Sequence, residues 1–179
     1  DAQVLVRGVA RRAGPARRPV SPAPAFRVRH YDVDLDYRVA TNRLSATAVL
    51  HVEVPAATDR LRLELDGLTV EKVTVDGRRA GWRHREARLD VRPTAPLTPG
   101  RPAVVAVRYR GHPRPRHGPF GDVGWEELTD GVLVAGQPDG APTWFPCRDD
   151  PAEKATYRIA VTVESPYLVV ANGVLTDRR

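Results

Sequence analysis

The sequence predicts an all-β fold, a β-sandwich of mainly antiparallel sheets. Three observations support this: short segments of alternating apolar and polar residues recur along the chain, Pro and Gly separate them, and no segment sustains a helical period. The 179 residues include 17 prolines and 14 glycines, which is typical of a fold with many turns. With 41% hydrophobic residues, a chain of this length can bury one good-sized core.

The clearest strands form a predicted hairpin. Tyr31, Val33, Leu35 and Tyr37 alternate with polar residues, so they occupy one face of a strand. A turn over residues 41–43 precedes a second alternating segment over 44–54, which predicts antiparallel pairing. Further strands are expected over residues 61–65, 68–75, 82–85, 87–91, 103–109, 131–135, 157–163 and 168–171, with an irregular loop over 110–122.

Residues 1–24 differ in composition from the rest of the chain. They contain five arginines against a single aspartate and end in a Pro-rich stretch. We therefore predict a flexible or partly ordered Arg/Pro-rich leader over residues 1–24, followed by a β domain over residues 25–179. The chain starts with Asp and contains no Met, from which we expect a processed product or an excised fragment.

Composition also bears on partners and compartment. The net charge is +6, but outside the leader Arg alternates with Asp and Glu, and no cluster of aromatic and basic residues forms a stacking platform. We therefore expect no nucleic-acid partner. An Arg-driven nucleic-acid module stays an alternative, and it predicts binding that weakens steeply with salt and requires residues 1–24.

No apolar run approaches the ~20 residues that span a bilayer, so we expect no membrane partner. Cys147 is the single cysteine, which excludes an intrachain disulfide and a Cys-rich metal site. With no retained secretory signal, the expected location is cytoplasmic, while a cleaved signal leaves secretion open.

Three nucleophilic or metal-binding side chains are candidates for chemistry. His112 and His117 share one loop, but a zinc site needs three or four ligands, so we interpret both as solvated. Cys147 has no evident His partner, and we expect a small buried residue rather than a nucleophile. The sequence therefore predicts no catalytic residue among them.

Paired carboxylates occur twice, at Glu126-Glu127 and at Asp149-Asp150. Adjacent residues of a strand point to opposite faces, so neither pair forms the dyad of a glycoside hydrolase by itself. We expect Asp149 to brace the turn before Pro151. Gln137 is the stronger polar candidate, because it follows a predicted strand and offers both a donor and an acceptor. Two interpretations of the Gln137 side chain stay open, contact with a ligand and stabilisation of a turn.

Motifs in the second half of the chain carry a resemblance. Thr-Trp-Phe-Pro-Cys occupies residues 143–147, followed by Asp149, Pro151 and Lys-Ala-Thr-Tyr over 154–157. With the hairpin over 30–48 and Asn-Gly at 172–173, the chain resembles the N-terminal domain of aminopeptidase N-type zinc metallopeptidases, especially small bacterial members. The resemblance extends over residues 26–175.

This resemblance implies a saddle-like β domain that packs on a thermolysin-like catalytic domain of the same polypeptide. It also implies that Gln137, eight positions before Phe145, binds the free α-amine at the N-terminus of a peptide substrate. The chain departs from many members at Pro142, where Arg is common, and the contact which that Arg makes is in doubt here. An exposed apolar patch near residues 136–150 is expected where the catalytic domain docks.

The family's catalytic motifs are not in this sequence. His-Glu-x-x-His is absent, and a chain without Met cannot contain Gly-x-Met-Glu-Asn. We therefore expect no cofactor in this chain, zinc in the catalytic domain that it lacks, and no activity of these residues alone. The alternative is a stand-alone β-sandwich module that binds protein or carbohydrate.

Overall fold

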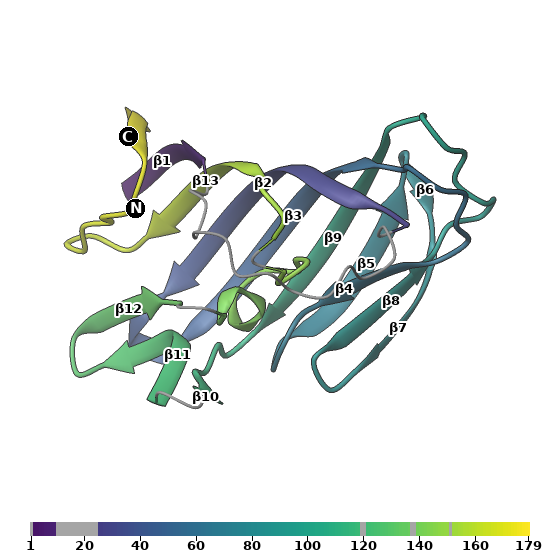
Figure 1. Ribbon diagram of the computed structural model, residues 1–179. Coiled ribbons are helices and arrows are strands. Elements are labelled where there is room, and N and C mark those ends of the chain that lie inside the picture. Colours follow the sequence, from purple (N-terminus) through teal and green to yellow (C-terminus); the bar gives the residue numbers. More distant parts are fainter. Residues whose placement is uncertain (1, 10–24, 119–120, 137–138, 151) are drawn as a thin grey trace.

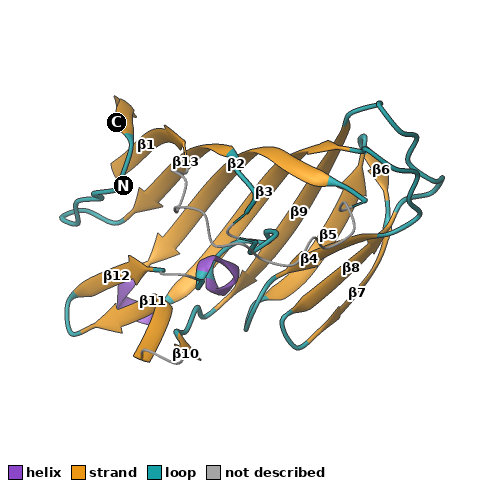
Figure 2. Cartoon of the chain, viewed as in Figure 1, coloured by secondary structure: helices purple, strands orange, loops and turns teal. Residues whose placement is uncertain are grey.

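The computed structural model describes residues 2–9, 25–118, 121–136, 139–150 and 152–179 (Figure 1). The strands are β1 Ala2–Val9, β2 Arg27–Arg38, β3 Arg43–Glu53, β4 Leu61–Glu64, β5 Thr69–Val75, β6 Arg78–Arg79, β7 Gly81–Arg85, β8 Arg88–Arg92, β9 Ala103–Gly111, β10 Arg116–Gly118, β11 Gly121–Leu128, β12 Gly131–Ala135, β13 Thr156–Val163 and β14 Val174–Arg178. Two short 3-10 helices, η1 Val39–Thr41 and η2 Ala141–Thr143, are the helical elements of these residues (Figure 2). The all-β prediction is confirmed.

One large sheet forms the frame of the molecule. It has eight strands in the order β14-β1-β13-β2-β3-β9-β5-β6, and every pair is antiparallel except β13 with β2. Two smaller sheets, β10-β11-β12 and β4-β8-β7, lie in front of it in the view of Figure 1. The core lies between the large sheet and these elements.

The predicted hairpin is confirmed as β2 and β3. Val33 pairs with Ala48 in the antiparallel register, and both are buried. Asn42 closes the turn in the left-handed region, with φ of 46°, which Asn tolerates better than most residues. Alternation sends Asp34 to the opposite, solvated face of the sheet.

The end of the chain differs from expectation. Residues 168–171 form no strand, and the last strand is β14, Val174–Arg178. Strand β13 has no free edge for the residues that follow it, because β1 and β2 occupy both of its sides. The chain therefore pairs on the outer edge of β1 instead.

The predicted irregular loop over residues 110–122 is also partly wrong. Arg116–Gly118 forms β10 and pairs with the start of β11, with Arg116 opposite Val123. Gly118 and Gly121 face each other across this pair. This pairing was not predicted because the segment is short, is rich in Gly and Pro, and lacks an extended alternation of apolar and polar residues.

The leader expectation needs correction for residues 2–9. Ala2–Val9 is strand β1, which lies between β13 and β14 in the large sheet, so the composition change after residue 24 does not separate leader from sheet. Val4 is buried while Gln3 is exposed, as strand alternation requires. The rest of the expected leader, residues 1 and 10–24, lies outside the described residues. No helix in the described part of the chain has the length and apolar character to cross a membrane.

Candidate functional site

The candidate site is centred on the loop between β12 and β13. We call its residues 139–150 the elbow. Gln137, the predicted amine-binding residue, lies outside the described residues, as do Pro138 and Pro151. The described neighbours of Gln137 are Gly136 and Asp139, and a Cβ atom on Gly136 would lie 2.6 Å from the Asp139 carbonyl oxygen. The chain on either side of Gln137 is therefore closely packed against itself.

Thr143 joins the elbow to strand β11. The elbow begins its 3-10 turn at Gly140, which has φ of 118°, and the Thr143 hydroxyl donates to the Gly140 carbonyl at 2.7 Å. The oxygen of the same hydroxyl accepts a hydrogen bond from the backbone N–H of Trp125 at 3.1 Å. A Cβ atom on Gly124 would lie 2.2 Å from the Thr143 Oγ1, so this contact requires glycine on β11.

Backbone hydrogen bonds attach the elbow to strand β4. Glu64 and Cys147 exchange both bonds of an antiparallel bridge, at 2.7 and 2.9 Å. The Asp66 N–H donates to the Pro142 carbonyl at 2.7 Å. Pro142 lacks an N–H of its own, but this position uses only its carbonyl. The elbow thereby adds a segment to the β4 edge of the sheet β4-β8-β7.

Aromatic side chains anchor the elbow on the large sheet. The Tyr109 hydroxyl donates to the Trp144 carbonyl at 2.8 Å, and Tyr109 is fully buried. Phe145 meets Tyr31 edge-to-face with ring centroids 5.4 Å apart. The Tyr31 hydroxyl also accepts from the Arg148 N–H at 3.2 Å. Burial raises the pKa of both tyrosines, which keeps their hydroxyls protonated.

Two carboxylates of the elbow, Asp139 and Asp149, lie near the Arg116 guanidinium and the Glu64 carboxylate. Arg116 Nη2 is 2.9 Å from Asp139 Oδ2 and 3.7 Å from Asp149 Oδ2. The Gly140 N–H donates to Asp149 at 3.4 Å, so Asp149 braces the 3-10 turn of the elbow, while Pro151, beside the turn at which it was expected, lies outside the described residues. Burial raises the pKa of Asp149 and of Glu64. Arg116 was not a predicted site residue, because its partners are distant in sequence.

The prediction that Cys147 is a small buried residue is confirmed. Its side chain is buried, and burial raises the pKa of its thiol, which disfavours the nucleophilic thiolate. His117 is solvated, with 86% of its side chain exposed, and lies 2.8 Å from Asp122. His112 is also exposed, and its ring Nδ1 lies 3.1 Å from the Asn42 carbonyl oxygen.

The two carboxylates of each pair have different environments, although only Glu126 and Glu127 lie in a strand. Glu126 and Glu127 are consecutive residues of β11, and only Glu127 faces the Asn42 side chain, whose amide donates to it at 3.0 Å. Asp149 and Asp150 engage different arginines, Arg116 and Arg148. Neither pair forms a catalytic dyad.

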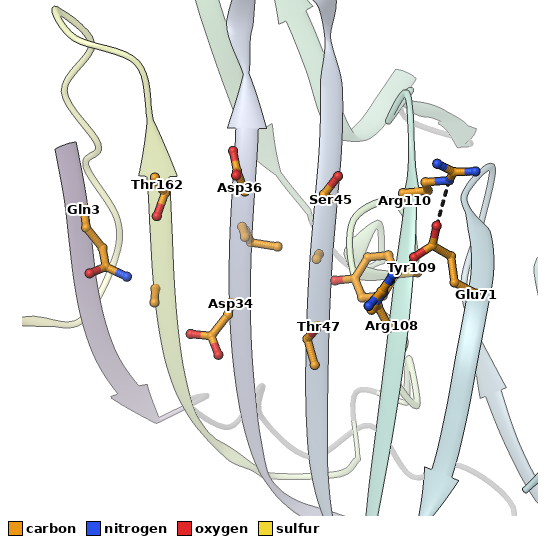
Figure 3. A pocket seen from close by; sticks show the side chains of 13 residues that line it. Gln3, Asp34, Asp36, Ser45, Thr47, Glu71, Arg108, Tyr109, Arg110 and Thr162 are labelled. Atoms are coloured by element: carbon orange, nitrogen blue, oxygen red, sulfur yellow. Dashed lines mark hydrogen bonds and ion pairs between the residues drawn. The ribbon is translucent and has the colours of Figure 1, made fainter. Parts of the chain in front are cut away.

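A hollow of about 450 Å³ lies on the other face of the large sheet (Figure 3). Its labelled polar lining residues are Gln3, Asp34, Asp36, Ser45, Thr47, Glu71, Arg108, Arg110 and Thr162. Arg108 and Arg110 both reach Glu71, at 2.8 and 2.9 Å. Because strand side chains alternate, this hollow is separated from the elbow by the thickness of the sheet.

The expected apolar patch is not at residues 136–150. Among the described residues of that range, no large hydrophobic side chain is exposed, since Trp144 and Phe145 pack partly against the core. Exposed aliphatic residues lie instead on the preceding hairpin, at Leu128, Leu133 and Val134, and near the C-terminus. The elbow uses its apolar residues for its own attachment.

Comparison with solved structures identifies similar folds. The chain is 28% identical to an M1 zinc metallopeptidase variant from Deinococcus radiodurans bound to a Tyr-Ser-Ala substrate, with a TM-score of 0.72 over 78% of this chain and 33% of that one. It is 26% identical to a two-domain M1 zinc metallopeptidase variant bound to L-arginine, with a TM-score of 0.74 over 84% of this chain and 38% of that one. Legionella pneumophila aminopeptidase A shares the fold, at 16% identity and a TM-score of 0.65 over 79% of this chain and 16% of that one.

The chain thus spans about a third of the length of the two metallopeptidases. No curated protein matches it. A family model, the Peptidase M1 N-terminal domain, matches residues 27–179, which is most of the chain and includes the elbow. The chain belongs to the family of Peptidase M1 N-terminal domains.

Proposed function

We propose that this chain is the non-catalytic N-terminal domain of a zinc metalloaminopeptidase that cleaves N-terminal residues from peptides. The observation that supports the proposal is the family match over residues 27–179, a range that includes the elbow before β13. In this proposal the chain forms one wall of an active site whose catalytic groups lie in a second domain.

Gln137 is the proposed substrate-binding residue. Its side-chain carbonyl oxygen can accept a hydrogen bond from the α-ammonium group of a peptide without adding charge. Its described neighbours are Gly136 and Asp139, and Asp139 pairs with Arg116 at 2.9 Å. Carboxylates of the second domain would supply the negative charge for the ammonium group.

The zinc ion of the proposed enzyme does not fit this chain. No group of three or more His, Cys, Asp and Glu side chains among the described residues is arranged to hold a metal ion. The proposal therefore assigns all zinc ligands to the second domain, where a bound zinc ion would polarise the scissile carbonyl and activate water.

The test uses the complete gene product. We expect bound zinc and release of N-terminal residues from peptides with a free α-amine. Gln137→Ala should raise KM for these substrates roughly tenfold or more, because one hydrogen bond to a charged group is lost. Gln137→Glu, which keeps an acceptor oxygen, is the matched control and should retain binding.

The outcome has two levels. A zinc-free product without peptidase activity would refute the proposed enzyme. An active enzyme whose KM is unchanged by Gln137→Ala would refute only the assignment of Gln137.

A further inference from the structure

Arginine side chains gather on the outer face of the sheet β4-β8-β7, toward the right of Figure 1. On β8, Leu89 and Val91 are buried, so alternation turns Arg88, Asp90 and Arg92 away from the core. The register aligns the outward residues of β4 and β7 with them. We call the resulting five exposed arginines the arginine face: Arg62, Arg83, Arg85, Arg88 and Arg92.

The arginine face has more positive charge than its carboxylates neutralise. Asp90 pairs with Arg62 at 3.3 Å and with Arg88 at 3.0 Å. The other three arginines of the face make no ion pair in the part of the chain that the structure describes. Glu64 lies opposite Arg88 in the register, and Glu86 lies in the adjoining turn. Even with both of them counted, the arginines outnumber the carboxylates.

Strand β7 contributes two arginines whose charges are not compensated. Arg85 lies directly opposite Arg88, with residues 86–87 as the turn between them. Like charges at directly opposite positions destabilise the pairing of two strands. Arg83 and Arg85 are alternate residues of β7, so they share a face at a spacing of about 6.8 Å. A partner with negative charges at a similar spacing would relieve this repulsion.

Strand β7 also has an open edge. It is the last strand of the sheet β4-β8-β7. In an antiparallel pair only alternate residues direct their backbone N–H and C=O groups to the neighbouring strand, so the others on β7 point away from β8. Among the described residues, no backbone hydrogen bond joins residues 81–85 to a third strand. An edge of this kind can accept an extended peptide as an additional strand.

We propose that β7 binds an extended acidic segment of a partner protein, which pairs with the open edge and directs its carboxylates to the arginine face. Side chains at every second position of an extended segment lie on one face, about 6.8 Å apart. Asp or Glu at these positions therefore matches the spacing of Arg83 and Arg85. Backbone hydrogen bonds would supply affinity, and the guanidinium groups would select for carboxylates. The inference does not depend on peptidase activity.

The outer face of the large sheet is less suited to such a partner. Arg108 and Arg110 both pair with Glu71, at 2.8 and 2.9 Å. Arg158 pairs with Asp34 at 3.2 Å. An acidic segment on that face would have to compete with carboxylates that already hold these arginines. Charge complementarity therefore favours the arginine face.

A nucleic acid is also less suited to this surface. Proteins that bind single strands combine basic groups with aromatic side chains on which the bases stack. Trp82 is the aromatic residue of β7, and alternation directs it to the face opposite Arg83. The arginine face thus offers charge without a stacking platform.

Binding of a short peptide to the complete gene product tests the inference. The probe alternates Glu and Val, and it is acetylated so that it offers no free α-amine to the proposed aminopeptidase site. We expect saturable binding that weakens with salt, measured by isothermal titration calorimetry. A peptide of the same composition with its Glu residues adjacent to each other directs carboxylates to both faces and should bind about tenfold more weakly.

Two pairs of substitutions separate the arginine face from net charge. Arg83→Ala combined with Arg85→Ala should weaken binding of the alternating probe about tenfold, because two ion pairs are lost. Arg78→Ala combined with Arg79→Ala removes the same charge from β6, which pairs with β5, and should change the affinity less than about twofold.

Modified probes test the pairing with the edge of β7. One probe is N-methylated at its Val nitrogens and another at its Glu nitrogens, so that both keep their charges. Only one of the two sets of N–H groups can face β7, and we expect the affinities of the two probes to differ about tenfold. Equal affinities would overturn the edge pairing.

Three further outcomes would overturn the inference. The first is a folded product that does not bind the alternating probe. The second is equal weakening by the two pairs of substitutions, or equal binding of a single-stranded oligonucleotide of the same net charge, which would indicate an unselective polyanion surface. The third is self-association that Arg83→Ala and Arg85→Ala abolish, which would assign the surface to a second copy of the chain. Zinc content and peptidase activity enter none of these measurements, so the proposed function is tested separately.

Discussion

The elbow contrasts with a second region, the aliphatic end, whose exposed residues are Leu128, Leu133, Leu168, Val170, Val174 and Leu175. The two regions are neighbours along the chain but use their apolar residues in opposite ways. In the elbow, Phe145 packs against Tyr31 and Trp144 accepts a hydrogen bond from Tyr109, so the loop is attached from within. In the aliphatic end, Leu133 and Val170 point to solvent. The comparison indicates that the chain stabilises the loop beside the proposed site through its own core contacts and leaves aliphatic side chains of the neighbouring segments exposed.

The largest expected effect tests the close approach in the elbow. Gly124→Ala would place a Cβ atom 2.2 Å from Thr143 Oγ1 at a residue with φ of 96°. We expect a loss of about 3 kcal/mol in the free energy of unfolding, measured by urea denaturation of the 179-residue chain.

Gly131→Ala is the matched control from the hairpin of the aliphatic end. Gly131 also has positive φ, 116°, but no atom lies within 4 Å of its Cβ position. The control contains the backbone strain without the clash, so we expect a loss of about 1 kcal/mol. Equal losses in the two variants would show that the contact with Thr143 adds nothing.

The second prediction compares two tyrosine hydroxyls. Tyr109→Phe removes the donor to the Trp144 carbonyl in the core, and we expect a loss of about 2 kcal/mol because a buried acceptor is left without its partner. Tyr167→Phe removes an exposed bond to Asp130 and should lower the free energy of unfolding by only about 0.5 kcal/mol. A larger loss for Tyr167→Phe would reverse the proposed contrast.

The third prediction concerns Arg116. Arg116→Met leaves Asp139 and the part-buried Asp149 without their shared cation, so we expect a loss of about 1.5 kcal/mol. Arg29→Met, which breaks an exposed pair with Glu53, is the control and should change stability by less than about 0.5 kcal/mol. Thermal unfolding at neutral pH measures both, and similar shifts would argue against a special role of Arg116.

The smallest expected effect is a change of stability with pH that has opposite signs for Glu64 and Glu164. Burial, with Asp149 nearby, raises the pKa of Glu64, so protonation of this group favours the folded state and its contribution is lost as pH rises through the folded pKa. Replacing it by Gln removes this loss. Glu64→Gln should therefore gain stability relative to the parent chain as pH rises above about 4.3.

Glu164 begins the segment that leads to the aliphatic end and should respond in the opposite direction. Hydrogen bonds from its own N–H and from the Val39 N–H lower the pKa of Glu164, so its contribution is present above the unfolded pKa and lost as pH falls. Glu164→Gln should lose stability relative to the parent chain as pH rises toward about 4.3, with the loss complete above that pH. Urea denaturation at several pH values would contradict the prediction if both variants shifted in one direction.

Much of the fold could be predicted from local pattern. Alternation predicted β2 and β3, and the turn between β5 and β6 has Asp-Gly, a dipeptide typical of tight turns, at residues 76–77, where both residues have positive φ. The missed strands β1 and β14 are short or lie in a composition typical of a leader or a loop. Their formation depends on which edges of other strands remain free, and the local sequence pattern contains no information on this.

The candidate site was predictable only in part. Proline and aromatic residues marked the elbow, and the family resemblance drew attention to Gln137. Arg116, Thr143 and Gly124 carried no comparable signal, because each acts through a partner at least 18 residues away. The placement of the apolar patch was wrong for the same reason, since the core contacts of the elbow are tertiary.

The amino-acid sequence alone therefore determined which segments are extended, where several turns fall and to which family the motifs point, because periodicity and turn chemistry act over a few residues. The tertiary structure decided the order of the strands, the parallel pairing of β13 with β2 and the attachment of the elbow. It also decided which aliphatic residues stay exposed. These features depend on which edges and faces remain free once distant segments have met, and no local pattern contains that information.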